Sequence, residues 1–379
     1  MAISIRSRPA QSHLQYVFIG ATVLAAFAAV LPIAAAIITG AGLKGSTKTA
    51  FASAPSGSYA VVSRPEEEYD VVAVTPAGGG EAVEVARVPH LPGFTASGSV
   101  SPNGKQLALV TVDAGSPTRP KASLLLLDLE SGETKHLAGD VGALQTAVWS
   151  LDGRSIVVTR EVDGGKARPN VRFLRVAVRD GAAAELFDVP APLGAYAIGF
   201  DLAGALISVS IDGSGSHLVR NGAEIALLSP QITRDWRLSP DGAQVAFIEA
   251  NLESGLRYIA RTRNVDGSEG REVEGQSGAA TQQLGAAWKP GEGSATFGRE
   301  PSSAARSTEI GETQAQSQSL SVSGFDVPLE YAPDGSTLSV THWSGSSFSQ
   351  PGSATLQLMA GSNRIDVPNF TRFYGWAAR

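Results

Sequence analysis

The sequence predicts an all-β fold in which a unit of four short strands is repeated seven times around a ring. Two observations lead to this prediction. One turn motif recurs at intervals of 38 to 51 residues, usually between a bulky apolar residue and an alternating apolar run. In addition, helical periodicity is absent beyond residue 50, while 42 Gly and 21 Pro among 379 residues indicate many turns.

The repeated motif is clearest in "LSPDGAQVAF", which runs from Leu238 to Phe247. Its apolar first residue ends a strand, its Pro and Gly fit the dihedral angles of a reversing turn, and its alternating run forms the next strand. The other copies are "SAPSGSYAVV" from Ser53, "VSPNGKQLAL" from Val100, "WSLDGRSIVV" from Trp149, "FDLAGALISV" from Phe200, "WKPGEGSATF" from Trp288 and "YAPDGSTLSV" from Tyr331.

A second strand–turn–strand element follows the motif within a unit. Examples are "KASLLLLDLESGETKHLAG" from Lys121, "VRFLRVAVRDGAAAELFD" from Val171 and "LRYIARTRNVDGSEGREVEG" from Leu256. Four short strands in each unit of roughly 40 to 50 residues are typical of a β-propeller blade. We therefore predict a seven-bladed β-propeller with four-stranded blades over residues 54–379.

The two ends of the repeat region complete one another. The chain ends in "RFYGWAAR", where Trp376 takes the bulky position but no turn or second strand follows. The first copy has the turn and the later strands, but only Ser53 at the bulky position. We expect the strand near Trp376 to pair with the strand near Tyr59–Ser63, which closes the ring and removes its free edges.

The first 53 residues predict a membrane anchor and a tether. No charged residue occurs from Tyr16 to Ile38, and a helix of these 23 residues would be about 34 Å long, enough for a hydrocarbon core of ~30 Å. We assign 1–13 as a short cytoplasmic N-terminus, 14–39 as a transmembrane helix that serves as signal anchor, and 40–53 as a linker. A cleaved signal peptide is the alternative, because "LPIAAA" joins a helix breaker to small residues.

This assignment predicts a single-pass protein of the cytoplasmic (inner) membrane. Its N-terminus would lie inside and its propeller on the periplasmic, extracytoplasmic side. The net charge of −6 gives no general attraction to nucleic acid. The absence of cysteine excludes disulfides, thiolate metal ligands and a cysteine nucleophile.

The tandem motifs resemble the WD40-like (PD40) repeats of the TolB-type β-propeller family. The matching segments include "SPNGKQLALVT", "SLDGRSIVVT", "SPDGAQVAFIE" and "APDGSTLSVTHW", and the resemblance covers about residues 53–379. It implies a propeller but is nearly silent on activity. Members of the wider family include periplasmic proteins that bind partners, propeller domains of serine peptidases and membrane-tethered proteins.

The most recurrent carboxylates are the turn residues Asp152, Asp241 and Asp334. A metal-binding ring is one interpretation. However, Ala203 and Gly291 replace the Asp in two copies, and an Asp at a turn ordinarily accepts a backbone N–H two residues on. We therefore predict a structural role for these carboxylates.

The histidines give no metal-ligand spacing. They are His13, His90, His136, His217 and His342. The stretch "IDGSGSHLV" from Ile211 gathers Asp, Ser and His, so a nucleophile–base pair is conceivable, but a glycine-rich hairpin is the favoured interpretation. Neither a G-x-S-x-G motif nor a phosphate-binding loop occurs. We predict no catalytic, cofactor-binding or metal-binding residues and no cofactor.

These observations predict a non-enzymatic protein that acts in protein–protein interaction. We expect an accessory or stabilising subunit of a larger membrane protein complex, which contacts the lipid bilayer through the N-terminal helix. A polar stretch, 299–324, is interpreted as a solvated outer strand pair or as a contact surface for a partner. The alternative function is a small-ligand or glycan-binding, or lactonase-like, propeller that uses its central channel.

Overall fold

A computed structural model describes residues 50–379 except 117–118, 144, 163–169, 191–192, 253–255, 269–270, 273–281, 300–308, 312–317 and 320–323. A short 3-10 helix, η2 (Ala50–Ser53), comes first, and strands β1 to β28 follow it. Most of the polar stretch 299–324 lies outside the described residues.

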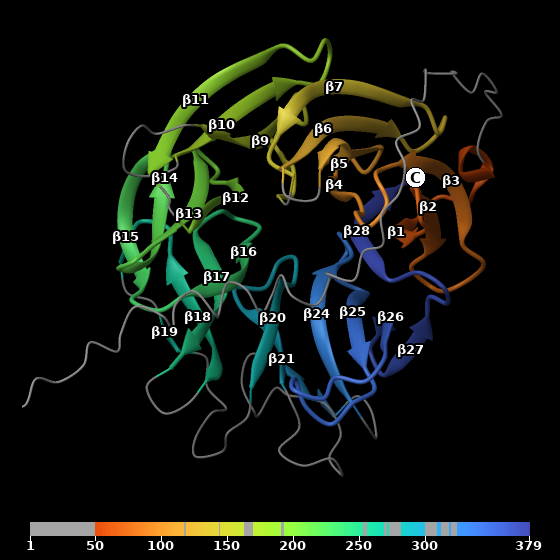
Figure 1. Ribbon diagram of the computed structural model, residues 1–379. Helices are drawn as coiled ribbons and strands as arrows, with labels where there is room; N and C mark the ends of the chain where they lie inside the picture. The colour runs from red at the N-terminus through yellow and green to blue at the C-terminus, as the bar shows by residue number, and fades with distance from the viewer. Residues whose placement is uncertain are drawn as a thin grey trace, which may run out of the picture. The chain divides into compact units, whose positions relative to one another are not determined.

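The strands form seven four-stranded antiparallel sheets arranged around a common centre (Figure 1). Six of them take four consecutive strands each, and the remaining one joins both ends of the described chain. In each sheet, the strand named first below is the innermost one.

The composite sheet contains β28 (Arg372–Ala378), β1 (Ser58–Pro65), β2 (Tyr69–Pro76) and β3 (Val83–Pro89). The next two sheets contain β4 (Ser97–Val100), β5 (Gln106–Ser116), β6 (Arg119–Asp128) and β7 (Thr134–Val141), and then β8 (Val148–Trp149), β9 (Ser155–Val162), β10 (Asn170–Ala177) and β11 (Ala183–Pro190).

The fourth and fifth sheets contain β12 (Gly194–Phe200), β13 (Leu206–Asp212), β14 (Gly215–Arg220) and β15 (Ala223–Ser229), and then β16 (Thr233–Leu238), β17 (Gln244–Asn251), β18 (Arg257–Asn264) and β19 (Arg271–Glu272). The last two contain β20 (Gln283–Trp288), β21 (Ala295–Arg299), β22 (Glu309–Gly311) and β23 (Gln318–Ser319), and then β24 (Phe325–Tyr331), β25 (Leu338–Trp343), β26 (Ala354–Ala360) and β27 (Asn363–Asp366).

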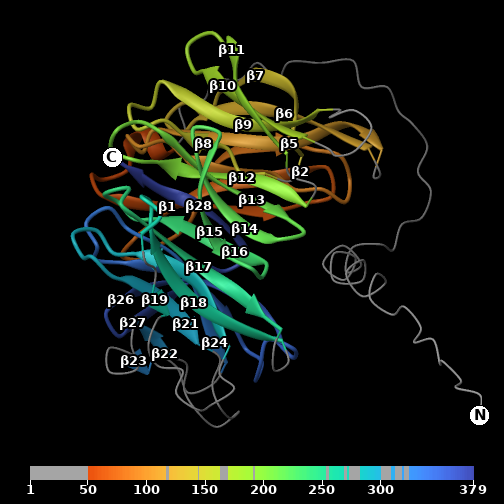
Figure 2. The ribbon, with the colours of Figure 1, turned by 90° about the vertical axis from the view of Figure 1, so that its left-hand side faces the viewer.

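The end strands close the ring in the predicted way. β28 pairs antiparallel with β1, and Trp376 is the register partner of Ala60. Beyond the two strands, Gly57 and Arg379 exchange backbone hydrogen bonds of 2.9 and 3.0 Å. The C-terminus therefore lies beside β1 and β28 (Figure 2).

The hydrophobic core lies between neighbouring sheets. Val110 and Leu124 of one sheet pack in a single buried cluster with Ile156 and Leu174 of the next. Full burial of such a side chain contributes roughly 1.5–3 kcal/mol, so each sheet depends on both of its neighbours.

Tryptophans add directional bonds between the sheets. The indole Nε1 atoms of Trp149, Trp288 and Trp376 donate to backbone oxygens of the preceding sheet's innermost strand, namely those of Ser99, Arg237 and Glu330, at 2.9, 2.9 and 3.4 Å. The bulky residue of the motif thus connects consecutive sheets.

The recurrent Asp of the motif fixes the turn, as predicted. Asp241 Oδ1 accepts from the backbone N–H of Ala243 at 3.1 Å and from the Ser239 hydroxyl. Asp152 and Asp334 each accept a backbone N–H two residues on in the same way. Because a serine hydroxyl and this N–H stabilise each carboxylate, the pKa of all three is lowered.

The glycine that closes the turn also contacts the turn of the preceding sheet. Gly242 has a φ of +67°, and a Cβ there would lie 2.7 Å from Asp201 Cα. Gly153 has the same φ of +67°, but the nearest atom to its Cβ would be Pro102 Cδ at 3.8 Å. Close contact between neighbouring turns therefore occurs at Gly242 and is looser at Gly153.

The predicted fold class needs one correction. It placed a transmembrane helix before the propeller, whereas the described part of the chain has no helix of sufficient length and apolar character to cross a membrane. The segment of that prediction, 14–39, lies outside the described residues. The architecture that the structure describes is the β-propeller.

We predict that Gly242→Ala destabilises the protein more than Gly153→Ala. Both substitutions carry the left-handed backbone penalty of about 1–2 kcal/mol, but only the Ala at 242 meets the neighbouring backbone, which adds about 1–3 kcal/mol. Urea unfolding of the two variants measures the difference. Equal losses of unfolding free energy would show that the contact between turns does not contribute.

Candidate functional site

Extra residues interrupt the pairing of five innermost strands with their neighbours. The register shifts lie between Ala197 and Gly199 in β12, Arg234 and Arg237 in β16, Leu284 and Ala287 in β20, Pro328 and Glu330 in β24, and Phe373 and Gly375 in β28. A bulge breaks the alternation of side chains along a strand and re-aims them. Neighbouring residues can therefore line the same channel wall.

The innermost strands enclose a cavity of about 490 Å³ in the central channel. Six of the seven sheets contribute to its lining. The lining includes Ser99, Gln145, Tyr196, Trp236, Arg237, Glu330, Phe373 and Tyr374. This volume is in the range of small-molecule binding sites.

Two opposite charges, Arg237 and Glu330, face this cavity at the same level of the repeat. Each immediately precedes the last residue of its strand, and Ala287 is their counterpart on β20, the innermost strand between them. Both side chains are solvent-exposed. Among the ion pairs of the described residues, none joins the two.

Enclosure by the ring shifts the protonation of Glu330. Glu330 is reached by water from the channel, but the protein atoms that surround it in the ring partly desolvate its carboxyl and raise the pKa of that group, while the positive charge of Arg237 opposes the shift. No hydrogen bond among the described residues involves this carboxylate. Arg237 uses Nη1 to donate to the Trp236 carbonyl at 3.1 Å.

An unusual backbone conformation positions Arg237. Asp235, within the bulge of β16, has a φ of 55°. Its Oδ2 accepts from the backbone N–H of Gly285 on β20 at 3.3 Å and from Arg234 Nε at 3.1 Å. A non-glycine residue in this region is strained, so these bonds hold the bulge in place.

Aromatic side chains make the channel wall rigid. The rings of Tyr196 and Trp236 stack with centroids 5.1 Å apart, and Trp236 Nε1 donates to Thr233 Oγ1 at 2.7 Å. Tyr374 is buried, and its hydroxyl accepts from Ser63 Oγ at 2.9 Å. The cavity therefore presents a preformed surface.

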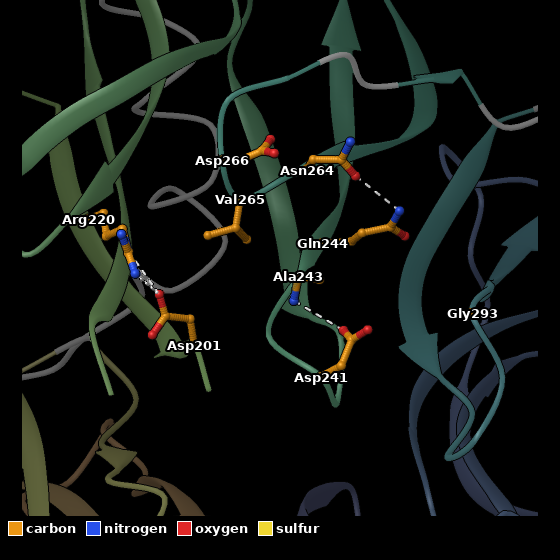
Figure 3. A pocket seen from close by; sticks show the side chains of 9 residues that line it. All are labelled: Asp201, Arg220, Asp241, Ala243, Gln244, Asn264, Val265, Asp266 and Gly293. Carbon is orange, nitrogen blue, oxygen red and sulfur yellow. Dashed lines mark hydrogen bonds and ion pairs between the residues drawn. The ribbon is translucent and has the colours of Figure 1, made fainter. Parts of the chain in front are cut away.

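A second cavity, of about 430 Å³, lies at the turn end of the sheets (Figure 3). Its charged groups are already engaged: Asp201 pairs with Arg220 at 2.6 Å, and Asp241 caps its own turn. Gln244 Nε2 donates to Asn264 Oδ1 at 3.1 Å. Within the described residues, no group of His, Asp or Glu has the arrangement of a metal site.

The hairpin singled out in the sequence does bring Ser214, His217 and two carboxylates together. His217 Nε2 lies 3.0 Å from Ser214 Oγ, and Nδ1 lies 3.0 Å from Glu224 Oε1. This resembles a nucleophile–base–acid relay. However, Ser214 Oγ also lies 2.6 Å from Asp212 Oδ1.

The assignment of hydrogen-bond donors and acceptors argues against a nucleophile at Ser214. A carboxylate can only accept, so the Ser214 hydroxyl donates to Asp212 and must accept from His217 Nε2–H. His217 Nδ1 likewise donates to Glu224, which makes the ring a doubly protonated imidazolium. Burial lowers the His217 pKa, but the hydrogen bonds to Glu224 and Asp212 outweigh it, and the net pKa is raised.

His90 and His342 each contact a buried carboxylate, whereas His136 is exposed and His13 lies outside the described residues. His90 Nε2 lies 3.3 Å from Asp70 Oδ1, with both side chains buried. His342 Nδ1 lies 2.8 Å from Asp326 Oδ1, and Arg364 also binds this carboxylate. Burial raises the pKa of Asp326, but these two partners outweigh burial and the pKa is lowered.

Comparison with known proteins identifies the fold. No family model and no curated protein matches the sequence. TolB from Acinetobacter baumannii superimposes with a TM-score of 0.50 at 14% identity, over 85% of this chain and 67% of that one. The chain shares the β-propeller fold of TolB, so the resemblance to TolB-type propellers is confirmed for the fold.

Enzymes with propellers are equally similar. A prolyl endopeptidase matches with a TM-score of 0.53 at 11% identity, over 82% of this chain and 49% of that one. An oligogalacturonate lyase in complex with manganese matches with 0.51 at 13% identity, over 77% and 82%. The chain thus spans about half the length of the endopeptidase, and at these identities the likeness shows the fold alone.

We predict that His217 stabilises the protein in a pH-dependent manner. Its folded pKa is raised, so the stabilisation is fully present below the unfolded value near 6.5 and is lost as pH rises through the folded value. The difference in unfolding free energy between wild type and His217→Gln should therefore shrink from pH 6 to pH 9. His136→Gln, at an exposed site on β7, is the control.

A difference that grows with pH would contradict this assignment. It would mean that the neutral imidazole is the favoured form and would restore His217 as a candidate base.

Proposed function

We propose that this protein is a non-catalytic β-propeller, tethered to the cytoplasmic membrane, that binds another membrane protein on the extracytoplasmic side. It would act as an accessory or stabilising subunit of a complex. The observation that carries this proposal is a ring of apolar residues at the turn end of the sheets.

We call this surface the turn ring. It consists of the second residue of each repeated turn, namely Pro55, Pro102, Leu151, Leu202, Pro240, Pro290 and Pro333. Leu151 is 52% exposed and Leu202 is 71% exposed, and the prolines are exposed or, at Pro290, half-buried. The seven positions are equivalent in the repeat, so these apolar groups lie at the same end of every sheet, as expected of an interaction surface.

The first described residues, those of η2, lead into the first turn of the turn ring. η2 ends at Ser53, and Gly57 pairs with Arg379 beyond the same ends of β1 and β28.

Charge favours a protein over the lipid surface as the occupant. Asp152, Asp241 and Asp334 place three carboxylates between the apolar residues, and these are ionised at neutral pH because the pKa of an Asp is low even before it is lowered further here. Anionic lipid headgroups would be repelled by them. A partner protein that offers apolar and basic side chains matches both features.

The non-catalytic part of the proposal is supported by the side-chain chemistry. Ser214 and His217 hydrogen-bond to one another within a turn, and the carboxylates that line the second cavity already accept hydrogen bonds from other protein groups. A structural role therefore explains why these reactive side chains lie together, and no catalytic role is needed.

We predict position-dependent crosslinking of the full chain in its native membrane. A photoreactive residue at Leu151 or Leu202 should capture the same integral membrane protein. Leu252 and Leu256 are the matched controls, since they are 44% and 52% exposed at the opposite end of β17. Capture there should be at least about tenfold weaker.

Three results would overturn the proposal. They are capture of lipid alone at the turn ring, no capture there, or capture of the same protein with equal yield at all four positions. Thermal unfolding of each variant checks that the propeller is intact.

A further inference from the structure

We propose that the central channel binds a small zwitterion, whose carboxylate pairs with Arg237 and whose ammonium group pairs with Glu330. The site is separate from the turn ring and goes beyond partner binding. Its basis is the presence of two opposite charges that face one enclosed, water-accessible cavity and lack an ion-pair partner among the described residues.

The two charged groups are on different sheets and, in the part of the chain that the structure describes, form no direct ion pair. They project from β16 and β24, which are separated in the ring by β20. β20 places Ala287 at the equivalent level, so no side chain there bridges them. A ligand that spans the gap would complete both interactions.

The hydrogen-bonding capacity of both groups also favours a ligand that carries a carboxylate and an ammonium group. A guanidinium has five N–H donors, and Arg237 uses one of them in a hydrogen bond of 3.1 Å to a backbone carbonyl. The remaining fork matches the geometry of a carboxylate. The Glu330 carboxylate can only accept when ionised, which suits the three donors of an ammonium group.

The channel wall favours a ligand with an apolar middle section. The stacked Tyr196 and Trp236 rings and the side chains of Leu329 and Phe373 line the same cavity. Methylene groups between the two charged ends would pack against these surfaces. The enclosed environment also strengthens each charged contact relative to bulk water.

Binding should depend on pH through Glu330. The titratable and charged groups that line the cavity with it are Arg237, Tyr196 and Tyr374. Burial raises the pKa of both tyrosines, so they stay neutral. Since the pKa of the Glu330 carboxyl is raised toward neutrality, the carboxylate form that pairs with an ammonium group gains population between pH 6 and pH 8.

Calorimetry with the purified protein tests the proposal. The probes are ω-amino acids from glycine to 6-aminohexanoate, because the series varies the distance between the two charges. Hexanoate and pentylamine are controls that each lack one charge. At least one amino acid should bind with a Kd below about 1 mM at pH 8, and both controls at least about tenfold more weakly.

Variants and pH separate a binding role from a structural one. Arg237→Gln and Glu330→Gln should each weaken binding at least about tenfold, whereas Lys105→Gln, outside the channel, should not. Wild-type affinity should rise by about tenfold from pH 6 to pH 8, and Glu330→Gln should abolish that rise. Absence of binding at 10 mM for the whole series, or equal binding of the controls, would overturn the proposal.

Discussion

The pairing of β28 with β1 is the interaction on which the rest of this structure depends. Every other sheet takes its strands from one continuous stretch of chain, so it can form locally. The composite sheet forms only when two segments from opposite ends of the described chain meet. Because the cores lie between sheets, a missing innermost strand would expose two of them to water.

A buried polar cluster reinforces this closure. Ser63 on β1, Asp70 on β2 and Tyr374 on β28 meet away from solvent, where Asp70 Oδ2 also accepts the backbone N–H of Ala96 at 2.7 Å. Loss of one partner would leave a buried polar group unsatisfied, at a cost of about 1–3 kcal/mol. The same Tyr374 lines the channel, so closure and the shape of the cavity are coupled.

Ring geometry also explains why opposite charges can remain apart. Innermost strands hold their side chains at fixed positions around the axis, and neighbouring sheets restrain each strand on both sides. Arg237 and Glu330 therefore project from strands that β20 separates, and they form no ion pair among the described residues. A rigid scaffold that holds unpaired charges is preorganised for a ligand, since the cost of ordering them is already met in folding.

Much of the fold could be predicted because the repeat encodes it locally. The Pro, Asp and Gly of each turn fix a reversal by their own conformations and bonds, and alternating apolar residues mark the strand that follows. Trp376 and Ser53, as complementary halves of one motif, indicated the closure. The predicted transmembrane helix rested on hydropathy alone, and it forms no part of the architecture that the structure describes.

The channel site could not be predicted from the same signals. Bulges in the innermost strands break the alternation, so the sequence near Trp236 and Glu330 does not reveal which side chains face the axis. Clusters such as Asp326 with His342 and Arg364 join three strands of one sheet, and only the strand register brings them together. Hairpin residues near His217 were visible as a group, but their proton arrangement required the distances.

The central claim, closure by the terminal strands, can be tested with a disulfide. Gly57 and Arg379 form a hydrogen-bonded pair, so the next partners, Ser58 and Ala378, form the closer, non-hydrogen-bonded kind of pair that suits a disulfide. The chain has no cysteine of its own to interfere.

The measurement is urea unfolding of the double variant Ser58→Cys/Ala378→Cys, oxidised and reduced. We predict that the disulfide forms within one chain and raises the unfolding free energy by up to about 5 kcal/mol, because it joins the ends of a very long loop. Free thiols under oxidising conditions, or an oxidised form no more stable than the reduced one, would contradict the account.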